Sequence, residues 1–154
     1  MKKLLAKQLA AMPHRQLLVY RPDAESPFSR WTPAHHAQGF ILREEAVAFN
    51  TADVVEAEIA VYLADDFEPL RSAVTIIALP FATTGEVIVG TTVGEVFRIE
   101  LPAGTYQLYF EMTAPKGDRI GIRLTCTRSA KPKATVLRSA SPVVEPLLLT
   151  GEPM

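Results

Sequence analysis

The stretch Val55-Glu56-Ala57-Glu58-Ile59-Ala60-Val61-Tyr62-Leu63 decides the fold class, because every second residue in it is apolar and two of the residues between are glutamates. Side chains of a β-strand point alternately to the two faces of the sheet, so this period of two is typical of a half-buried strand. The same alternation recurs over Thr105–Met112 and over Ile120–Thr127. The sequence therefore predicts a β-protein built on these three strands.

Shorter apolar runs, separated by turn residues, fill most of the remaining chain. Pro80 is expected to end the strand that begins at Ser72, because proline cannot donate a hydrogen bond to a strand ladder. A further edge strand is expected from Val136-Leu137 and Val143-Val144. The other expected strands are Gln16–Arg21, Phe40–Phe49 (one strand, or two with an irregularity near Glu44-Glu45), Glu86–Val89 and Val96–Leu101. The pattern predicts an all-β fold, an antiparallel β-sandwich of about 8–9 strands.

The two ends of the chain differ from this pattern. Apolar residues near the start recur at helical spacing before Pro13, so a short amphipathic helix or arm is expected over residues 1–13. Lys7 and Gln8 interrupt the apolar run, which favours packing on the chain's own domain over a signal peptide or a membrane contact. Three prolines lie after residue 140. We therefore expect a β-sandwich domain over residues 14–140 and an extended Pro-rich tail over residues 141–154.

The composition is that of an ordinary globular protein. The 154 residues are 48% hydrophobic and 21% charged, with a formal net charge of −1, which argues against both a disordered chain and a strongly basic nucleic-acid binder. The single cysteine, Cys126, cannot form an internal disulfide or a multi-cysteine zinc site, and it favours a reducing compartment. Because Cys126 lies within an expected strand, we expect it to be buried and unreactive.

Charge is unevenly distributed along the chain. Residues 1–39 carry six Lys or Arg against two Asp or Glu, residues 40–100 carry three against eleven, and residues 101–154 carry seven against four. If the acidic side chains of the middle segment share one face, that face would attract a basic partner and repel nucleic acid. They also fit a solvated sheet face whose charges prevent edge-to-edge aggregation.

The stretch Trp31–Asn50 holds the residues that invite a catalytic or metal-binding hypothesis. His35 and His36 are adjacent, so both could bind one ion only from a loop, and no Asp or Glu lies within five residues of the pair. No nucleophile accompanies a matching base, and Gly90–Gly94 lacks the spacing and the lysine of a phosphate-binding loop. We therefore expect no catalytic residues, no metal site and no cofactor.

The same stretch carries a resemblance to a known family. Gln38-Gly39-Phe40, Arg43 and Val47-Ala48-Phe49 resemble the bacterial competence protein J family. The likeness continues from Ile76 through Pro80-Phe81 and over Leu101–Leu108, and it covers roughly residues 17–124. The Gln-Gly-Phe step in its context is its most specific part, and Gln38, Gly39, Phe40 and Arg43 are its signature residues.

The resemblance implies a cytoplasmic β-sandwich that binds and blocks a DNA-entry nuclease and has no catalysis of its own. The expected partner is a basic nuclease, and neither direct nucleic-acid binding nor membrane binding is implied. The family pattern supplies no contact residues. Charge suggests a possible acidic face that blocks the DNA groove of the nuclease, with the partner-binding residues Glu44, Glu45, Asp65, Asp66 and Glu68.

Two other functions stay open at the level of sequence. A small-ligand or carbohydrate-binding sandwich would use exposed aromatic side chains, for which the chain offers Trp31, Tyr20, Tyr62 and Tyr109. A metal-dependent enzyme would use His35 and His36. A domain of this size with exposed sheet edges could also form a homodimer.

Overall fold

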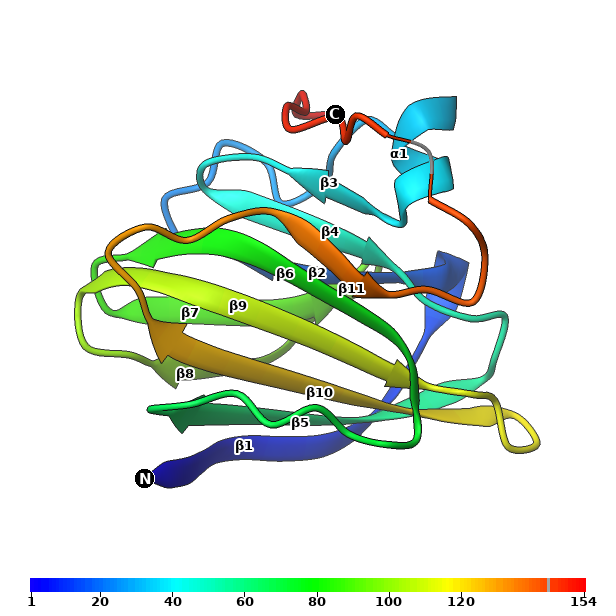
Figure 1. Ribbon diagram of the computed structural model, residues 1–154, viewed down its shortest axis with the longest axis horizontal. Coiled ribbons are helices and arrows are strands. Elements are labelled where there is room, and N and C mark those ends of the chain that lie inside the picture. Colours follow the sequence, from blue (N-terminus) through cyan, green and yellow to red (C-terminus); the bar gives the residue numbers. More distant parts are fainter. Residues whose placement is uncertain (144) are drawn as a thin grey trace.

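The computed structural model describes residues 1–143 and 145–154, which form two β-sheets on one hydrophobic core (Figure 1). The six-stranded sheet has the order β1-β5-β10-β9-β6-β11 and the five-stranded sheet the order β3-β4-β2-β7-β8. The bounds of the first are β1 (Lys2–Ala11), β5 (Glu56–Ala64), β10 (Arg119–Arg128), β9 (Gly104–Thr113), β6 (Ala73–Thr83) and β11 (Thr135–Arg138). Those of the second are β3 (Phe40–Leu42), β4 (Ala46–Asn50), β2 (Gln16–Tyr20), β7 (Glu86–Thr91) and β8 (Gly94–Glu100).

The all-β class is confirmed, but the strands number eleven within the described residues instead of about 8–9. The run from Phe40 to Phe49 is two strands, with the irregularity at Glu44-Glu45 forming the turn between β3 and β4. Val136-Leu137 belongs to the edge strand β11, whereas Val143 lies outside any strand and Val144 lies outside the described residues.

The expectation of a purely antiparallel fold is wrong at one pairing. Eight of the strand pairings are antiparallel, but β10 runs parallel to β5, with Ile122 beside Ile59 and Leu124 beside Val61. Alternation along a strand shows which residues face the core, but it carries no information on the direction of the neighbouring strand. The sequence therefore could not reveal this pairing.

The expected helix at the start of the chain is wrong. Lys2–Ala11 is the strand β1, which pairs antiparallel with β5 from Lys2 beside Ala64 to Ala11 beside Glu56, with a bulge between Leu4 and Ala6. Without β1, the backbone of β5 on that side would lack hydrogen-bond partners. The backbone hydrogen bonds between β1 and β5 outweigh the helical spacing of the apolar residues, because tertiary contacts commonly override local helix propensity.

Pro80 does not end its strand, because β6 continues to Thr83. On one side β6 pairs with β9 throughout this region, and Pro80 lies opposite Gln107. On the other side β11 pairs only with Ile76–Ala78, so β6 has a single neighbour at Pro80. A proline is tolerated in a strand where its missing N–H would face no partner.

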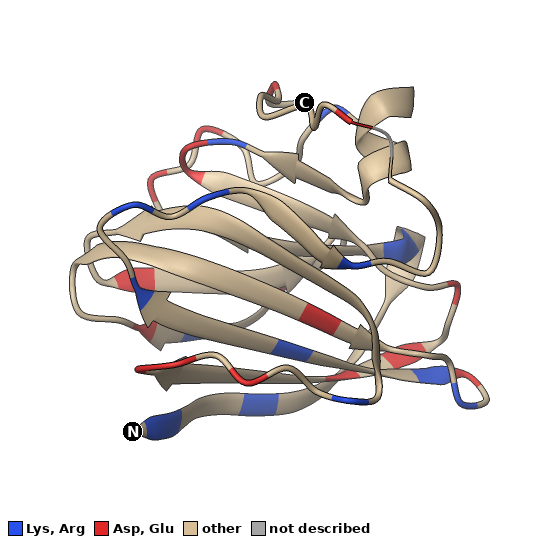
Figure 2. Ribbon diagram, in the orientation of Figure 1, with Lys and Arg blue, Asp and Glu red and all other residues tan. Residues whose placement is uncertain are grey.

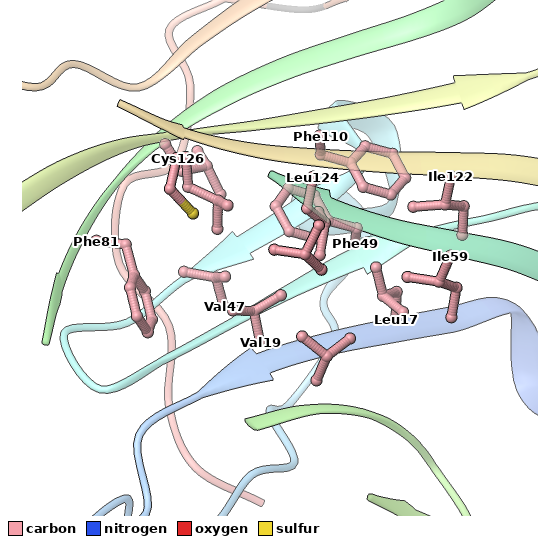
Figure 3. Packing of buried hydrophobic residues seen from close by; sticks show 14 of the residues in the cluster. Leu17, Val19, Val47, Phe49, Ile59, Phe81, Phe110, Ile122, Leu124 and Cys126 are labelled. Atoms are coloured by element: carbon pink, nitrogen blue, oxygen red, sulfur yellow. The ribbon is translucent and has the colours of Figure 1, made fainter. Parts of the chain in front are cut away.

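The core lies between the two sheets and follows the period of two (Figure 3). Ala57, Ile59 and Val61 of β5 are buried, whereas Val55 lies before the strand begins and is 63% exposed. Phe49 of the five-stranded sheet stacks on Phe110 of the six-stranded sheet, with ring centroids 4.3 Å apart. This aromatic pair joins the two sheets near the centre of the core.

Cys126 also points into the core, as expected from its strand (Figure 3). Burial raises the pKa of its thiol to about 12. The thiolate is the nucleophilic form, so at neutral pH this cysteine stays protonated and acts as a small hydrophobic residue.

A third layer covers the outer face of the five-stranded sheet. Phe28 and Trp31 pack there on a small cluster of Leu18, Ile41 and Ala48, and the short helix α1 (Pro33–Gln38) follows. This helix was not expected, although its signals are present: Thr32 caps its start, Pro33 opens it, and Gly39 ends it with φ of 89°.

Four strands form the edges of the two sheets: β1 and β11 in one, β3 and β8 in the other. A homodimer through one of these edges stays a prediction. Among the described residues, no helix is long and apolar enough to cross a membrane.

Candidate functional site

The five acidic residues predicted to bind the partner fall into two separate groups. Glu44 and Glu45 lie in the turn between β3 and β4, in the five-stranded sheet. Asp65, Asp66 and Glu68 lie in the loop between β5 and β6, in the six-stranded sheet. Lys and Arg residues are interspersed with Asp and Glu residues along the chain (Figure 2), and the predicted acidic residues lie in loops of two different sheets.

The β5–β6 loop is fastened across the outer face of the six-stranded sheet. Phe67 stacks on Tyr109 with ring centroids 3.8 Å apart. The backbone N–H of Leu70 donates to Glu111 Oε2 at 2.7 Å, and Arg138 Nη1 donates to the Leu70 carbonyl at 2.9 Å. Glu111, which is fully buried, also accepts from Arg123 Nε at 2.6 Å. One of the three contacts that hold this loop therefore rests on a buried ion pair.

Positive charges compensate the carboxylates of this loop. The amino group of Met1 contacts Asp65 Oδ2 at 2.8 Å, and this contact raises the pKa of the amino group. Asp66 and Glu68 line a hollow of about 190 Å³ together with Met1, Lys2 and Arg123. The Met1 amino group is paired with Asp65 and Arg123 with Glu111, so the field of Asp66 and Glu68 is weakened chiefly by Lys2.

The β3–β4 turn is built around the buried guanidinium of Arg43, whose side chain is only 3% exposed. Arg43 Nη1 donates to the carbonyls of Ser26 and Phe28 and to Ser29 Oγ, at 2.9, 3.1 and 3.1 Å. Arg43 Nη2 donates to Glu45 Oε1 at 3.0 Å. Glu45 is thereby neutralised, whereas Glu44 is exposed and makes no ion pair with any described residue.

Beside this turn lies a groove of about 500 Å³, called here the acidic groove. Apolar side chains from β3, β6 and the end of the chain line it, and three glutamates line it as well. The lining residues are Glu25, Leu42, Arg43, Glu44, Glu45, Pro80, Phe81, Ala82, Thr105, Leu149, Thr150, Gly151 and Pro153. The turn thus contributes both of its predicted acidic residues to one hollow surface.

The signature residues Gln38, Gly39 and Phe40 serve the structure of this region. Phe40 is completely buried in the main core. The N–H of Gly39 donates to the carbonyl of His35 at 2.9 Å and so closes α1. The side-chain amide of Gln38 makes two hydrogen bonds with the backbone of Leu148. Gln38 Nε2 donates to the Leu148 carbonyl, and the Leu148 N–H donates to Gln38 Oε1, both at 2.8 Å.

The end of the chain, residues 145–154, lies against α1 and the segment before it (Figure 1). After Leu148, the carbonyl of Thr150 accepts from His35 Nε2 at 2.8 Å, and the carbonyl of Glu152 accepts from the N–H of Arg30 at 2.9 Å. A Cβ atom on Gly151 would lie 2.3 Å from Ile41 Cγ2, so only glycine fits where the chain passes β3. These contacts hold the end of the chain as one side of the acidic groove.

The two histidines do not form a metal site in this arrangement. His35 is buried, and its Nδ1 accepts from the N–H of Thr32 at 3.2 Å while Nε2 donates to the Thr150 carbonyl. Neither ring nitrogen of His35 therefore keeps a free lone pair for an ion. His36 is exposed and packs on Trp31, with ring centroids 5.0 Å apart. No group of three metal-ligating side chains is found within the described residues.

The aromatic residues suggested as ligand platforms lie apart. The ammonium nitrogen of Lys2 lies over Tyr62, 4.5 Å from the centroid of the tyrosine ring, and Phe67 covers Tyr109. Trp31 alone lies beside a sizeable hollow, of about 610 Å³, to which Phe28 and Met154 also contribute. The Trp31 Nε1–H is buried and has no hydrogen-bond partner among the described residues.

Sequence reasoning missed Glu25 and the final residues as parts of the acidic groove. Glu25 stands in a loop without periodicity, and nothing in the tail sequence indicates where it docks. One signal was available. Arg43, Pro80-Phe81 and the run Leu101–Leu108 were separate segments of the family resemblance, and Arg43, Pro80, Phe81 and Thr105 meet at this groove.

Comparisons with known proteins give one family match and two matches of fold. The family model described as Competence protein J (ComJ) matches residues 10–131. Two solved structures share the fold. ComJ from Bacillus subtilis, an inhibitor of the DNA-degrading activity of NucA, has a TM-score of 0.67 at 21% identity, covering 82% of this chain and 99% of that one. A protein described as crocagin biosynthetic gene J has a TM-score of 0.51 at 17% identity, covering 81% and 97%. No curated protein sequence matches the chain.

Proposed function

The chain belongs to the competence protein J family, and on this ground we propose that it is a non-catalytic inhibitor of a DNA-entry nuclease, which it blocks by protein–protein binding. The observation that carries the proposal is the match of the family model over most of the chain. The B. subtilis structure, which shares the fold, is that of a nuclease inhibitor. The single cysteine, which can form no internal disulfide, suits a cytoplasmic protein.

The contact is expected to be electrostatic in part. A nuclease binds the phosphates of DNA through basic side chains, so its substrate groove attracts carboxylates. We expect the carboxylates that meet this basic surface of the nuclease to come from the two acidic groups, Glu44 with Glu45 and Asp65 and Asp66 with Glu68. The inhibitor would then act on the enzyme and would not need to bind nucleic acid or a membrane.

A cleavage assay tests this function directly. The nuclease encoded nearest to this gene is mixed with plasmid DNA and increasing amounts of the purified chain. We expect cleavage to fall to background at a slight molar excess of the chain, with a stable complex on size-exclusion chromatography.

An unrelated deoxyribonuclease serves as the control. Its activity should be unchanged, because a chain that protected DNA by coating it would stop both enzymes. Cleavage by the first nuclease that persists at a tenfold excess of the chain would rule the proposal out.

A second candidate function is the binding of a small ligand or carbohydrate, favoured by the hollow beside Trp31. Because Trp31 is the only tryptophan, a ligand in this hollow should change its fluorescence. A panel of simple sugars and nucleosides is titrated while the emission is recorded. A saturable change that is lost in Met154→Ala would support this function, and a flat response to the panel would count against it.

A further inference from the structure

We infer that the acidic groove is the surface that receives the nuclease, and that its occupant is an exposed basic segment of that enzyme. This inference rests on the proposed function. The nuclease would then contact Glu44 and Glu45, not the β5–β6 loop, and the end of the chain would form part of the contact.

The shape of the groove suits long basic side chains. Leu42, Pro80, Phe81 and Ala82 give it an apolar lining, and Leu149, which is 52% exposed, adds to it from the end of the chain. Lysine and arginine bury their methylene stems on apolar surface while their charged ends stay at the rim. Three glutamates line the same groove and are placed to meet such ends.

The acidic groove carries more uncompensated negative charge than the hollow beside the β5–β6 loop. In the acidic groove, Arg43 is the only lining cation, and it is buried and paired with Glu45. Glu25 and Glu44 are both exposed and make no ion pair with any described residue. In the hollow of Asp66 and Glu68, the Met1 amino group is paired with Asp65 and Arg123 with Glu111, and Lys2 is a further lining cation that opposes these two carboxylates. A basic partner is therefore attracted more strongly to the acidic groove.

The end of the chain completes the groove. Leu149, Thr150, Gly151 and Pro153 form one side of it, held there by Gln38 and His35. The family model matches residues 10–131, so this side lies outside the matched part of the chain. The opposite side, with Pro80 and Phe81, lies inside it. The tail therefore adds to the groove a side that the family model does not cover.

Paired charge reversals test the location. We expect Glu25→Lys/Glu44→Lys to weaken the nuclease complex by at least about tenfold, and by more at low salt, as measured by isothermal titration calorimetry. Asp53→Lys/Glu100→Lys changes the net charge equally at exposed sites away from the groove and should leave the affinity nearly unchanged. Asp66→Lys/Glu68→Lys should have a smaller effect than the groove variant.

Gly151→Val tests the tail without altering charge. Its side chain would clash with the buried Ile41, so the tail should leave its place and the inhibition constant should rise at least about threefold, while circular dichroism at the assay temperature should show that the two sheets stay folded.

The outcomes separate the location from the function. A wild-type chain that fails to inhibit the nuclease overturns the proposed function. A wild-type chain that inhibits, with affinity that falls in Asp66→Lys/Glu68→Lys but not in Glu25→Lys/Glu44→Lys, overturns the groove and leaves the function standing. Full inhibition by Gly151→Val overturns the role of the tail.

Discussion

Replacing Arg123 with methionine is expected to lower the free energy of unfolding by about 3–5 kcal/mol, because it strips a buried carboxylate of its partner. Glu111 is completely buried and accepts from Arg123 Nε at 2.6 Å. Its other oxygen accepts from the N–H of Leu70 at 2.7 Å, which does not neutralise the charge. Urea denaturation followed by circular dichroism measures the loss, and limited proteolysis reports whether the β5–β6 loop comes free.

Two further variants identify the cause. Glu111→Gln/Arg123→Met removes the buried charge together with its partner, so it should recover part of the lost stability. Arg119→Met breaks the neighbouring pair with Glu56, in which the Arg119 and Glu56 side chains are 55% and 32% exposed, and should cost less than about 1 kcal/mol. Equal losses for Arg123→Met and Arg119→Met would show that burial of the Glu111 pair does not matter.

The sequence predicted the strands well where one face of a sheet meets the core. Over Val55–Leu63, Thr105–Met112 and Ile120–Thr127 the period of two identified β5, β9 and β10. Each of these strands buries alternate side chains, so burial is written directly into the residue pattern. The all-β class follows from such segments.

The errors arose where contacts between distant segments determine the structure. Lys2–Ala11 has helical spacing but pairs with β5, and β10 lies parallel to β5, a direction no local pattern encodes. The helix α1 was missed for a different reason. Its capping signals at Thr32, Pro33 and Gly39 were present. The helix is only six residues long, however, and the prolines of the segment that leads into it are typical of a loop.

The candidate site shows the same division. The sequence names acidic residues as candidates, but it could not place them on a common face. The structure puts Glu44 beside Glu25 in the acidic groove, and Asp66 and Glu68 among the Met1 amino group, Lys2 and Arg123. Electrostatic potential depends on these neighbours in space, which a count along the chain does not contain.

Replacing Arg43 with methionine is expected to cost roughly 3 kcal/mol, because several hydrogen bonds to a buried charged group are lost together. The guanidinium holds the carbonyls of Ser26 and Phe28, and the carbonyl of Phe28 also accepts from the N–H of Met154. Loss of Arg43 should therefore loosen the loop before α1 and the end of the chain as well as the β3–β4 turn. We expect a lower melting temperature and faster hydrogen exchange at the Met154 amide.

Arg43→Lys shows why a guanidinium stands at this position. A lysine keeps the charge but presents one compact ammonium, which cannot reach the Ser26 and Phe28 carbonyls, Ser29 and Glu45 in the same forked geometry. The stability of Arg43→Lys should lie between those of the wild type and Arg43→Met. The Arg43→Lys variant should also inhibit the nuclease less well than the wild type, because both sides of the acidic groove shift. Arg21→Met, which breaks the pair with the largely exposed Asp23, is the matched control and should lose less than about 1 kcal/mol. If Arg43→Met is no less stable than Arg21→Met, the charge buried beneath the groove does not organise it.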